Sequence, residues 1–314
     1  STQAGTDMGG IQIYHNTGDP DDNDSLGYVS FLGNDSGASQ HQYAKIEAKS
    51  SSVTGGAEYG ELIFSTIGNA SDGNRFIIDG NSRISISNND SGGTGGSDST
   101  TGNTLFGYLA GNSIGSGSID NIFIGHHAGS GSSISSATSN VLIGGHSGQD
   151  LTSGDSNTSI GYNSGRSISS GQYNVFLGER AGHGVTQRSN NVYIGYKAGE
   201  LVDGASDNTA VGYQSMFSSG TAGNNTAEGN TAVGYQSLLA ITTGDKNVAV
   251  GYGAGDALTT GGSNVMLGQS AGTGTTNVDG AVIIGSNAGI ANMESGADGT
   301  VAVGKDALRS LTSG

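Results

Sequence analysis

The chain has 314 residues with 59 glycines, one proline, no cysteine and a formal net charge of −16 at pH 7. Glycine does not recur at every third position, which excludes a collagen triple helix, and the lack of cysteine excludes disulfides and thiolate metal sites. The acidic excess would repel phosphate backbones, so nucleic acid is not expected as a partner. No apolar run approaches the ~20 residues that span a bilayer, so membrane insertion is not expected either.

Residues 1–90 predict a small antiparallel β module. Stretches such as GYVSFLG, YAKIEAK and ELIFSTIG are separated by turns rich in Gly, Asn and Asp, which is typical of short strands joined by hairpins. Residues 91–102 are rich in Gly, Ser and Thr and are expected to form a linker. The first residues show no signal-peptide pattern and the last residues are still repeat-like, which indicates a processed chain or a fragment.

Residues 103–314 contain a repeat. Twelve copies align on one glycine, and the interval between successive copies is usually 17 residues and never shorter. We call these residues the ladder glycines: Gly107, Gly125, Gly144, Gly161, Gly178, Gly195, Gly212, Gly234, Gly251, Gly268, Gly285 and Gly304. The longest interval, from Gly212 to Gly234, holds NTAEG at 225–229, and the charge of Glu228 predicts an exposed loop there.

The residues around each ladder glycine follow one pattern. Asn stands four residues before it in ten copies, Thr, Val or Ile three before, an apolar residue one before, and Ala or Ser three after. In three central copies the pattern consists of Asn208, Val211, Gly212, Ser215, Asn230, Val233, Gly234, Ser237, Asn247, Val250, Gly251 and Ala254.

Two apolar positions flanking a variable one predict a short strand whose first and third side chains, such as Val250, face the core. Glycine permits a bend at the strand's end, and stacked Asn side chains can hydrogen-bond between layers. The Ala/Ser position indicates close backbones, near a symmetry axis or where two chains meet.

One copy cannot bury its apolar side, but stacked copies can, so the repeats predict an all-β, elongated β-helix or β-roll solenoid. Eleven steps of ~4.8 Å would make a rod roughly 50 Å long. A single short strand in 17 residues is little for one chain. We therefore expect several chains to share the core, most simply a homotrimer.

At this point the chain resembles known families. NTAVGYQSL with TTG turns is similar to repeats of bacteriophage tail fibres, and LGYVSFLGNDSG and NRFIIDGNSRISI are similar to segments just upstream in fibres of marine phages. The NVAVG core also resembles heads of trimeric autotransporter adhesins. The resemblance implies homotrimers, display on a virion tail or cell surface, and attachment to a host glycan or protein receptor, with no cofactor and no catalytic residue. We expect a structural and adhesive fibre protein, not an enzyme. An adhesin head is the alternative.

Two groups of residues are candidate metal sites. Asp19, Asp21 and Asn23 alternate as calcium ligands can, but the Gly and Glu of an EF-hand loop are missing, so a polar turn is favoured. Four histidines lie after ladder glycines, and packing is favoured over metal binding because His126 aligns with Tyr108 whereas His146 falls one position later. The four are His126, His127, His146 and His183.

Aromatic and acidic residues are candidates for binding or catalytic sites. A tyrosine column directly follows ladder glycines and predicts either packing between chains, which is favoured, or a surface that stacks on carbohydrate. Its members are Tyr108, Tyr162, Tyr196, Tyr213, Tyr235 and Tyr252. Glu179, Glu200 and Asp203 are candidates for a polysaccharide-degrading tailspike, the enzyme alternative, although no apolar pocket pattern accompanies them. An ice-binding solenoid would need an unbroken Thr column, which Val and Ile interrupt.

Overall fold

The computed structural model describes residues 24–34, 40–52, 59–68, 71–78, 84–86, 102–218, 225–293 and 295–312. The chain divides into two compact units, Ser1–Thr100 and Thr101–Gly314. Asp19, Asp21 and Asn23, and nearly all of the expected linker, lie outside the described residues. No helix within the described ranges has the length and apolar character needed to cross a membrane.

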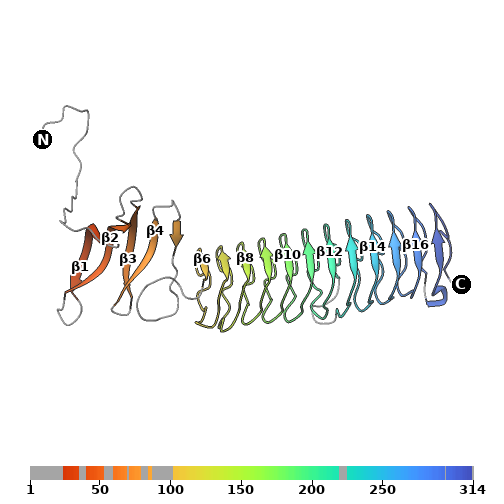
Figure 1. The fold of residues 1–314 in the computed structure, drawn as a ribbon. Coiled ribbons are helices and arrows are strands. Elements are labelled where there is room, and N and C mark those ends of the chain that lie inside the picture. Colours follow the sequence, from red (N-terminus) through yellow and green to blue (C-terminus); the bar gives the residue numbers. More distant parts are fainter. Residues whose placement is uncertain are drawn as a thin grey trace, which may run out of the picture. The chain divides into compact units, whose positions relative to one another are not determined.

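The first unit is an antiparallel sheet, as the sequence predicts. Its strands are β1 (Ser25–Asn34), β2 (Gln40–Ser52), β3 (Tyr59–Gly68), β4 (Ser71–Ile78) and β5 (Ile84–Ile86), and they pair in chain order (Figure 1). Val29 pairs with Ile46, which in turn pairs with Phe64, so apolar residues line up across three strands. Because residues directly opposite one another share a face of a sheet, these three lie on one apolar face.

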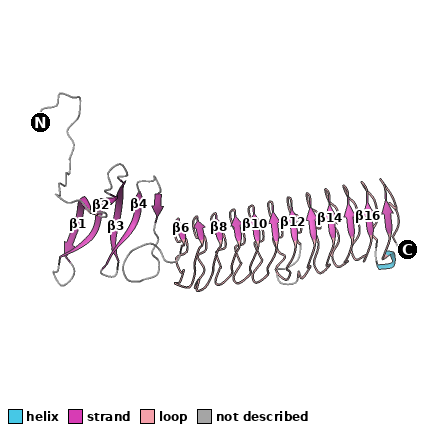
Figure 2. Cartoon of the chain, in the orientation of Figure 1, coloured by secondary structure: helices cyan, strands magenta, loops and turns pink. Residues whose placement is uncertain are grey.

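The second unit is a parallel β-solenoid of twelve three-residue strands, one from each copy, seen side by side in Figures 1 and 2. A short 3-10 turn, Ser295–Ala297, precedes the last strand. The strands are β6 (Thr104–Phe106), β7 (Ile122–Ile124), β8 (Val141–Ile143), β9 (Thr158–Ile160), β10 (Val175–Leu177), β11 (Val192–Ile194), β12 (Thr209–Val211), β13 (Thr231–Val233), β14 (Val248–Val250), β15 (Val265–Leu267), β16 (Val282–Ile284) and β17 (Val301–Val303).

The register of the stack never slips. Thr209 pairs with Thr231 and Val211 with Val233 across the longest interval, as equivalent residues do between all other neighbouring strands. Extra residues are therefore placed outside the strands, as the intervals predict. Glu228 is exposed, which confirms the prediction for its side chain.

The core runs along the inside of a single chain. It is formed by the middle residue of the strands, by the Ala/Ser column and by aliphatic residues of the opposite wall, such as Leu151 and Ile168. The expectation that one chain has too little strand to enclose a core is wrong, because turn residues as well as strands supply inward side chains. Ser215, Ser237 and Ala254 are fully buried within this core, not between chains.

The facing of the strands is the reverse of the expectation. Ala249, the middle residue of β14, is fully buried, whereas Val250 is 40% exposed. Val211 and Val233 occupy the same outward position in β12 and β13. The prediction was wrong because alternation along a strand defines two faces but does not identify which of them is buried. Middle residues from the small Ala249 to the large Phe176 are fully buried, whereas the first and third strand residues lie outside.

The bends and the Asn ladder fit the sequence prediction. Gly178 has a φ of +130°, and a Cβ atom there would lie 2.6 Å from the carbonyl oxygen of Gly195 in the next coil. Such a close approach requires glycine. Asn247 Nδ2 donates to Asn230 Oδ1 (3.0 Å) and to the carbonyl oxygen of Gly261 (2.9 Å). Ladder bonds of this kind satisfy polar groups inside the core.

Candidate functional site

The outer face of the solenoid sheet is uncharged along its whole length and mostly apolar, with threonine as its polar residue. We call the first and third strand residues the outward columns; each is exposed or partly exposed, and none is charged. The first column is Thr104, Ile122, Val141, Thr158, Val175, Val192, Thr209, Thr231, Val248, Val265, Val282 and Val301; the second is Phe106, Ile124, Ile143, Ile160, Leu177, Ile194, Val211, Val233, Val250, Leu267, Ile284 and Val303. A sheet face in contact with water normally carries polar residues, so these columns form a candidate interaction surface.

The first unit also exposes apolar side chains. Tyr28, Val29, Phe31 and Leu32 of β1 are each more than half exposed. They point to both faces of the sheet because side chains alternate along a strand. The edge strand of this unit is therefore a second apolar surface.

Four tyrosines form a continuous stack beside the outward columns. We call Tyr196, Tyr213, Tyr235 and Tyr252 the tyrosine ladder; each directly follows a ladder glycine in four successive coils. Centroids of neighbouring rings lie 5.3, 5.2 and 4.7 Å apart, with interplanar angles of 19°, 5° and 7°. The side chains are 38–58% exposed.

The stacking limits what the ladder can bind. A sugar ring packs against the flat face of an aromatic ring, but here each ring covers the face of its neighbour. Between Tyr196 and Tyr252 the ladder offers ring edges and hydroxyl groups instead. This geometry does not provide the open faces that the carbohydrate-stacking hypothesis needs.

The histidines near the start of the solenoid form a cluster. The centroids of the stacked His127 and His146 rings lie 5.2 Å apart, because both residues stand two positions after a ladder glycine. The ring of His126 stacks on that of Tyr108 with a centroid distance of 5.4 Å, as expected from their alignment. The centroids of the His126 and His127 rings are 4.4 Å apart. His183 belongs to a later coil. In the described part of the chain, no three His, Cys, Asp or Glu residues are grouped so that they could hold a metal ion.

The surroundings of His127 disfavour its protonation. Desolvation lowers the pKa of His127, and the neighbouring imidazoles of His126 and His146 lower it further. The Nδ1 atom of His127 lies 3.3 Å from Ser130 Oγ. The pKa of His127 is therefore below its ordinary value, which favours the neutral form of this ring.

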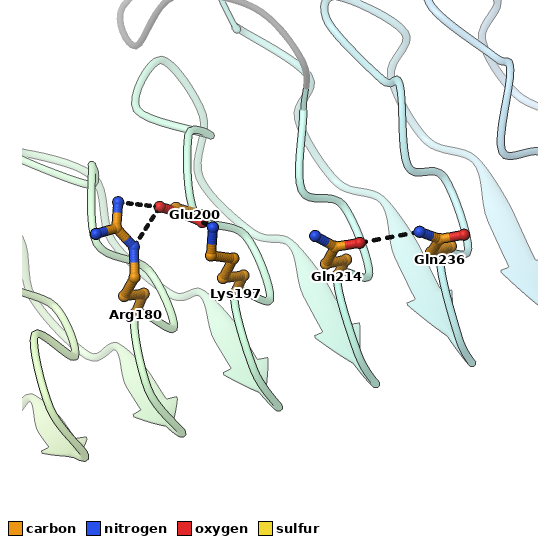
Figure 3. A network of polar contacts seen from close by, with 5 residues as sticks. All are labelled: Arg180, Lys197, Glu200, Gln214 and Gln236. Carbon is orange, nitrogen blue, oxygen red and sulfur yellow. Dashed lines mark hydrogen bonds and ion pairs between the residues drawn. The ribbon is translucent and has the colours of Figure 1, made fainter.

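The candidate catalytic carboxylates make structural contacts. Glu200, only 3% exposed, forms ion pairs with Arg180 and with Lys197, whose Nζ lies 3.4 Å from Glu200 Oε2 (Figure 3). Asp203 Oδ1 accepts hydrogen bonds from the backbone N–H and the hydroxyl of Thr186. Glu179 is exposed. Two of the three carboxylates therefore serve to join neighbouring coils.

Sequence reasoning missed the polar column that Figure 3 displays. Arg180, Lys197, Gln214 and Gln236 each stand two residues after a ladder glycine, in successive coils. Gln236 Nε2 donates to Gln214 Oε1 at 2.9 Å, and Lys197 also lies over the rings of Tyr196 and Phe217. The long polar side chains that recur at this position were the available signal.

No protein-family model, no curated protein and no solved structure matches this chain. The resemblance of the repeats to tail fibres and adhesin heads therefore remains a prediction. The candidate surface that the fold offers is the pair of outward columns, an uncharged and mostly apolar strip on a solenoid that encloses its own core.

Proposed function

We propose that this chain is a structural and adhesive segment of a phage tail fibre, which assembles as a homotrimer through the outward columns and displays surfaces for host attachment. The observation that carries the proposal is the uncharged outer face of all twelve strands. A chain with net charge −16 has many acidic residues, yet none stands in these columns.

The physical argument concerns surface that a lone chain leaves in water. Burial of apolar surface contributes roughly 25 cal/mol per Å². Because the outward columns continue through every coil, a second copy of the chain packed alongside them would bury apolar surface at each coil, and the stabilisation would add up along the solenoid. The apolar surface of β1 adds a second region that association would cover. The choice of three copies rests on the resemblance of the repeats to trimeric fibres.

The role in attachment follows from the same resemblance and implies display on a virion or another extracellular surface. A host glycan or protein receptor is the partner proposed. The head of a bacterial trimeric adhesin is the second candidate, because the Asn–Val–x–Val–Gly pattern of β14 and its equivalents is common to both. Neither role requires a catalytic residue or a cofactor.

Sedimentation analysis tests the assembly. Wild-type protein is expected to sediment as an elongated particle of about three chain masses. The double variant Val233→Asp/Val250→Asp places two charges in the outward columns. It should keep the circular dichroism of a β-sheet but no longer form the trimer. Thr260→Asp, in an exposed turn, is the matched control and should remain trimeric. A monomeric wild type, or a normal trimer of the double variant, would contradict the proposal.

Attachment is measured separately. Labelled protein should be retained on intact bacterial cells that carry the receptor. Enzymatic removal of surface polysaccharide or of surface protein distinguishes a glycan from a protein receptor. If no panel of bacterial cells retains a confirmed trimer, the adhesive part of the proposal is wrong while the structural part stands.

A further inference from the structure

The tyrosine ladder places reactive carbon atoms of like side chains next to one another. Coupling of two phenols occurs at the ring carbons beside the hydroxyl group. In the ladder the rings of successive coils are nearly parallel, and each tyrosine is partly open to solvent, so an oxidant can reach these residues while their rings are held side by side. Three successive ring pairs repeat this arrangement from the β11 coil to the β14 coil.

We propose that the tyrosine ladder is a site of oxidative modification, at which neighbouring tyrosines of one chain are coupled into dityrosine. The oxidant is of the peroxide class, used by a haem peroxidase. Each of two phenols loses one electron and one proton to give a tyrosyl radical, and the two radicals form a carbon–carbon bond. Rearomatisation moves the two ring hydrogens to the phenolic oxygens. Overall, two tyrosines and one hydrogen peroxide give one dityrosine and two waters.

Proximity makes the ladder the preferred site. Radical coupling is a second-order step, and two phenols held side by side react as if at very high local concentration. Tyr108 and Tyr162 are more exposed than Tyr196, Tyr213 and Tyr235, yet their ring contacts are with imidazoles of His126 and His146. If exposure alone decided where oxidation leads to coupling, Tyr108 would be the preferred site. Because coupling needs a second phenol close by, the tyrosine ladder is preferred instead.

A cross-link between Tyr213 and Tyr235 would join two coils across the longest interval of the repeat. Tyr213 and Tyr235 belong to the two coils joined by the longest interval, and β12 and β13 pair across it. A covalent bond between these residues closes a loop in the unfolded chain and so lowers its entropy. The oxidised protein should therefore unfold at a temperature several degrees higher.

The test treats the full chain with a haem peroxidase and hydrogen peroxide, then locates cross-linked peptides by mass spectrometry as pairs that have lost two hydrogens. Tyr213→Phe combined with Tyr252→Phe keeps the stacked rings, but the remaining Tyr196 and Tyr235 are two coils apart, with a phenylalanine between them. The yield of dityrosine should fall about tenfold or more in this variant. Tyr108→Phe combined with Tyr162→Phe is the matched control and should cross-link like the wild type.

Isotope labelling identifies which chains are joined. Labelled and unlabelled chains are refolded together and oxidised, and ladder cross-links should join peptides carrying the same label. Mostly mixed pairs, an unchanged yield in Tyr213→Phe/Tyr252→Phe, or oxidation at Tyr108 without ladder cross-links would overturn the proposal. The oligomeric mass is measured on the same samples before oxidation, so failure of the trimer proposal is recognised independently.

Discussion

Leu142 and Gly148 share one volume in the solenoid interior: a Cβ atom on Gly148 would lie 2.6 Å from Leu142 Cδ1. Leu142 is the inward residue of β8, and Gly148 follows the bend of the same coil. In the β13 coil the inward strand residue is Ala232, and the position equivalent to Gly148 is filled by Leu238, which is fully buried. Strand and bend thus exchange side-chain volume between these two coils. In the β9 and β14 coils both positions are small, and a large side chain of the next coil, Phe176 or Met266, reaches the bend glycine instead.

This exchange predicts a compensating pair of mutations. Leu142→Ala should lower the free energy of unfolding by about 2–5 kcal/mol through the cavity it leaves. Gly148→Leu should destabilise through collision with Leu142 Cδ1 and Cδ2. The double variant copies the Ala232 and Leu238 arrangement, so it should recover most of the loss. Denaturant unfolding of the four proteins forms a double-mutant cycle, and strictly additive losses would refute the exchange.

The ladder glycines give a second prediction, with a control at the end of the stack. Gly178→Ala combines a strained positive φ with a Cβ atom 2.6 Å from the next coil's carbonyl oxygen. Gly304 has a similar φ of +121°, but nothing lies within 4 Å of a Cβ atom there. We expect Gly304→Ala to cost about 1–2 kcal/mol from backbone strain and Gly178→Ala clearly more. Thermal unfolding compares them, and equal losses would mean that backbone strain alone requires glycine.

Most of the solenoid could be predicted from the repeat, because the same residue types recur at the same positions in successive copies. The invariant spacing of Asn247 and its equivalents predicted the ladder of buried amides, and the intervals located strands and loops. The facing of Val250 was not predictable from its copy alone, since an apolar residue fits either a core or an interface. The relation between Leu142 and Gly148 required comparison across copies at two positions, where large and small residues alternate.

The candidate site was less visible in the sequence. Tyr213 and Tyr235 stand in equivalent positions, but ring angles, which decide whether faces or edges are open, depend on packing. The burial of Glu200 depends on Arg180, which is twenty residues away and belongs to the preceding coil. Such contacts arise only once the coils are stacked, so acidic residues close in sequence gave no guide to their role.

The Asn ladder yields a third prediction. Asn247 donates to Asn230 Oδ1 and to the Gly261 carbonyl, and its Oδ1 accepts from the N–H and Nδ2 of Asn264. Asn247→Ala leaves these buried partners unsatisfied, which should lower the free energy of unfolding by roughly 2–4 kcal/mol. Denaturant titration measures it, with the exposed Thr260→Ala as the control. A loss below about 0.5 kcal/mol would show that water replaces the missing amide.

The histidine cluster predicts acid sensitivity at the first coils. The pKa of His127 is lowered from its ordinary value of 6.5 by desolvation and by His126 and His146. The unfolded chain therefore binds a proton more readily than the folded one, so this contribution to stability is present above about pH 6.5 and is lost as the pH falls below it. Hydrogen exchange should show that amides of β7 and β8 lose protection between about pH 7 and pH 5, ahead of those of β14.

The matched variant for this prediction is His126→Gln combined with His146→Gln. It removes both neighbouring imidazoles and should reduce the acid-induced loss of protection at β7 and β8. His183→Gln is the control that tests whether the effect is local to the first coils. Desolvation and the charge of Arg180 also lower the pKa of His183, but this residue belongs to a later coil. That variant should leave the behaviour of β7 and β8 unchanged. If protection at β7 and β8 is independent of pH in the wild type, the cluster does not couple protonation to folding.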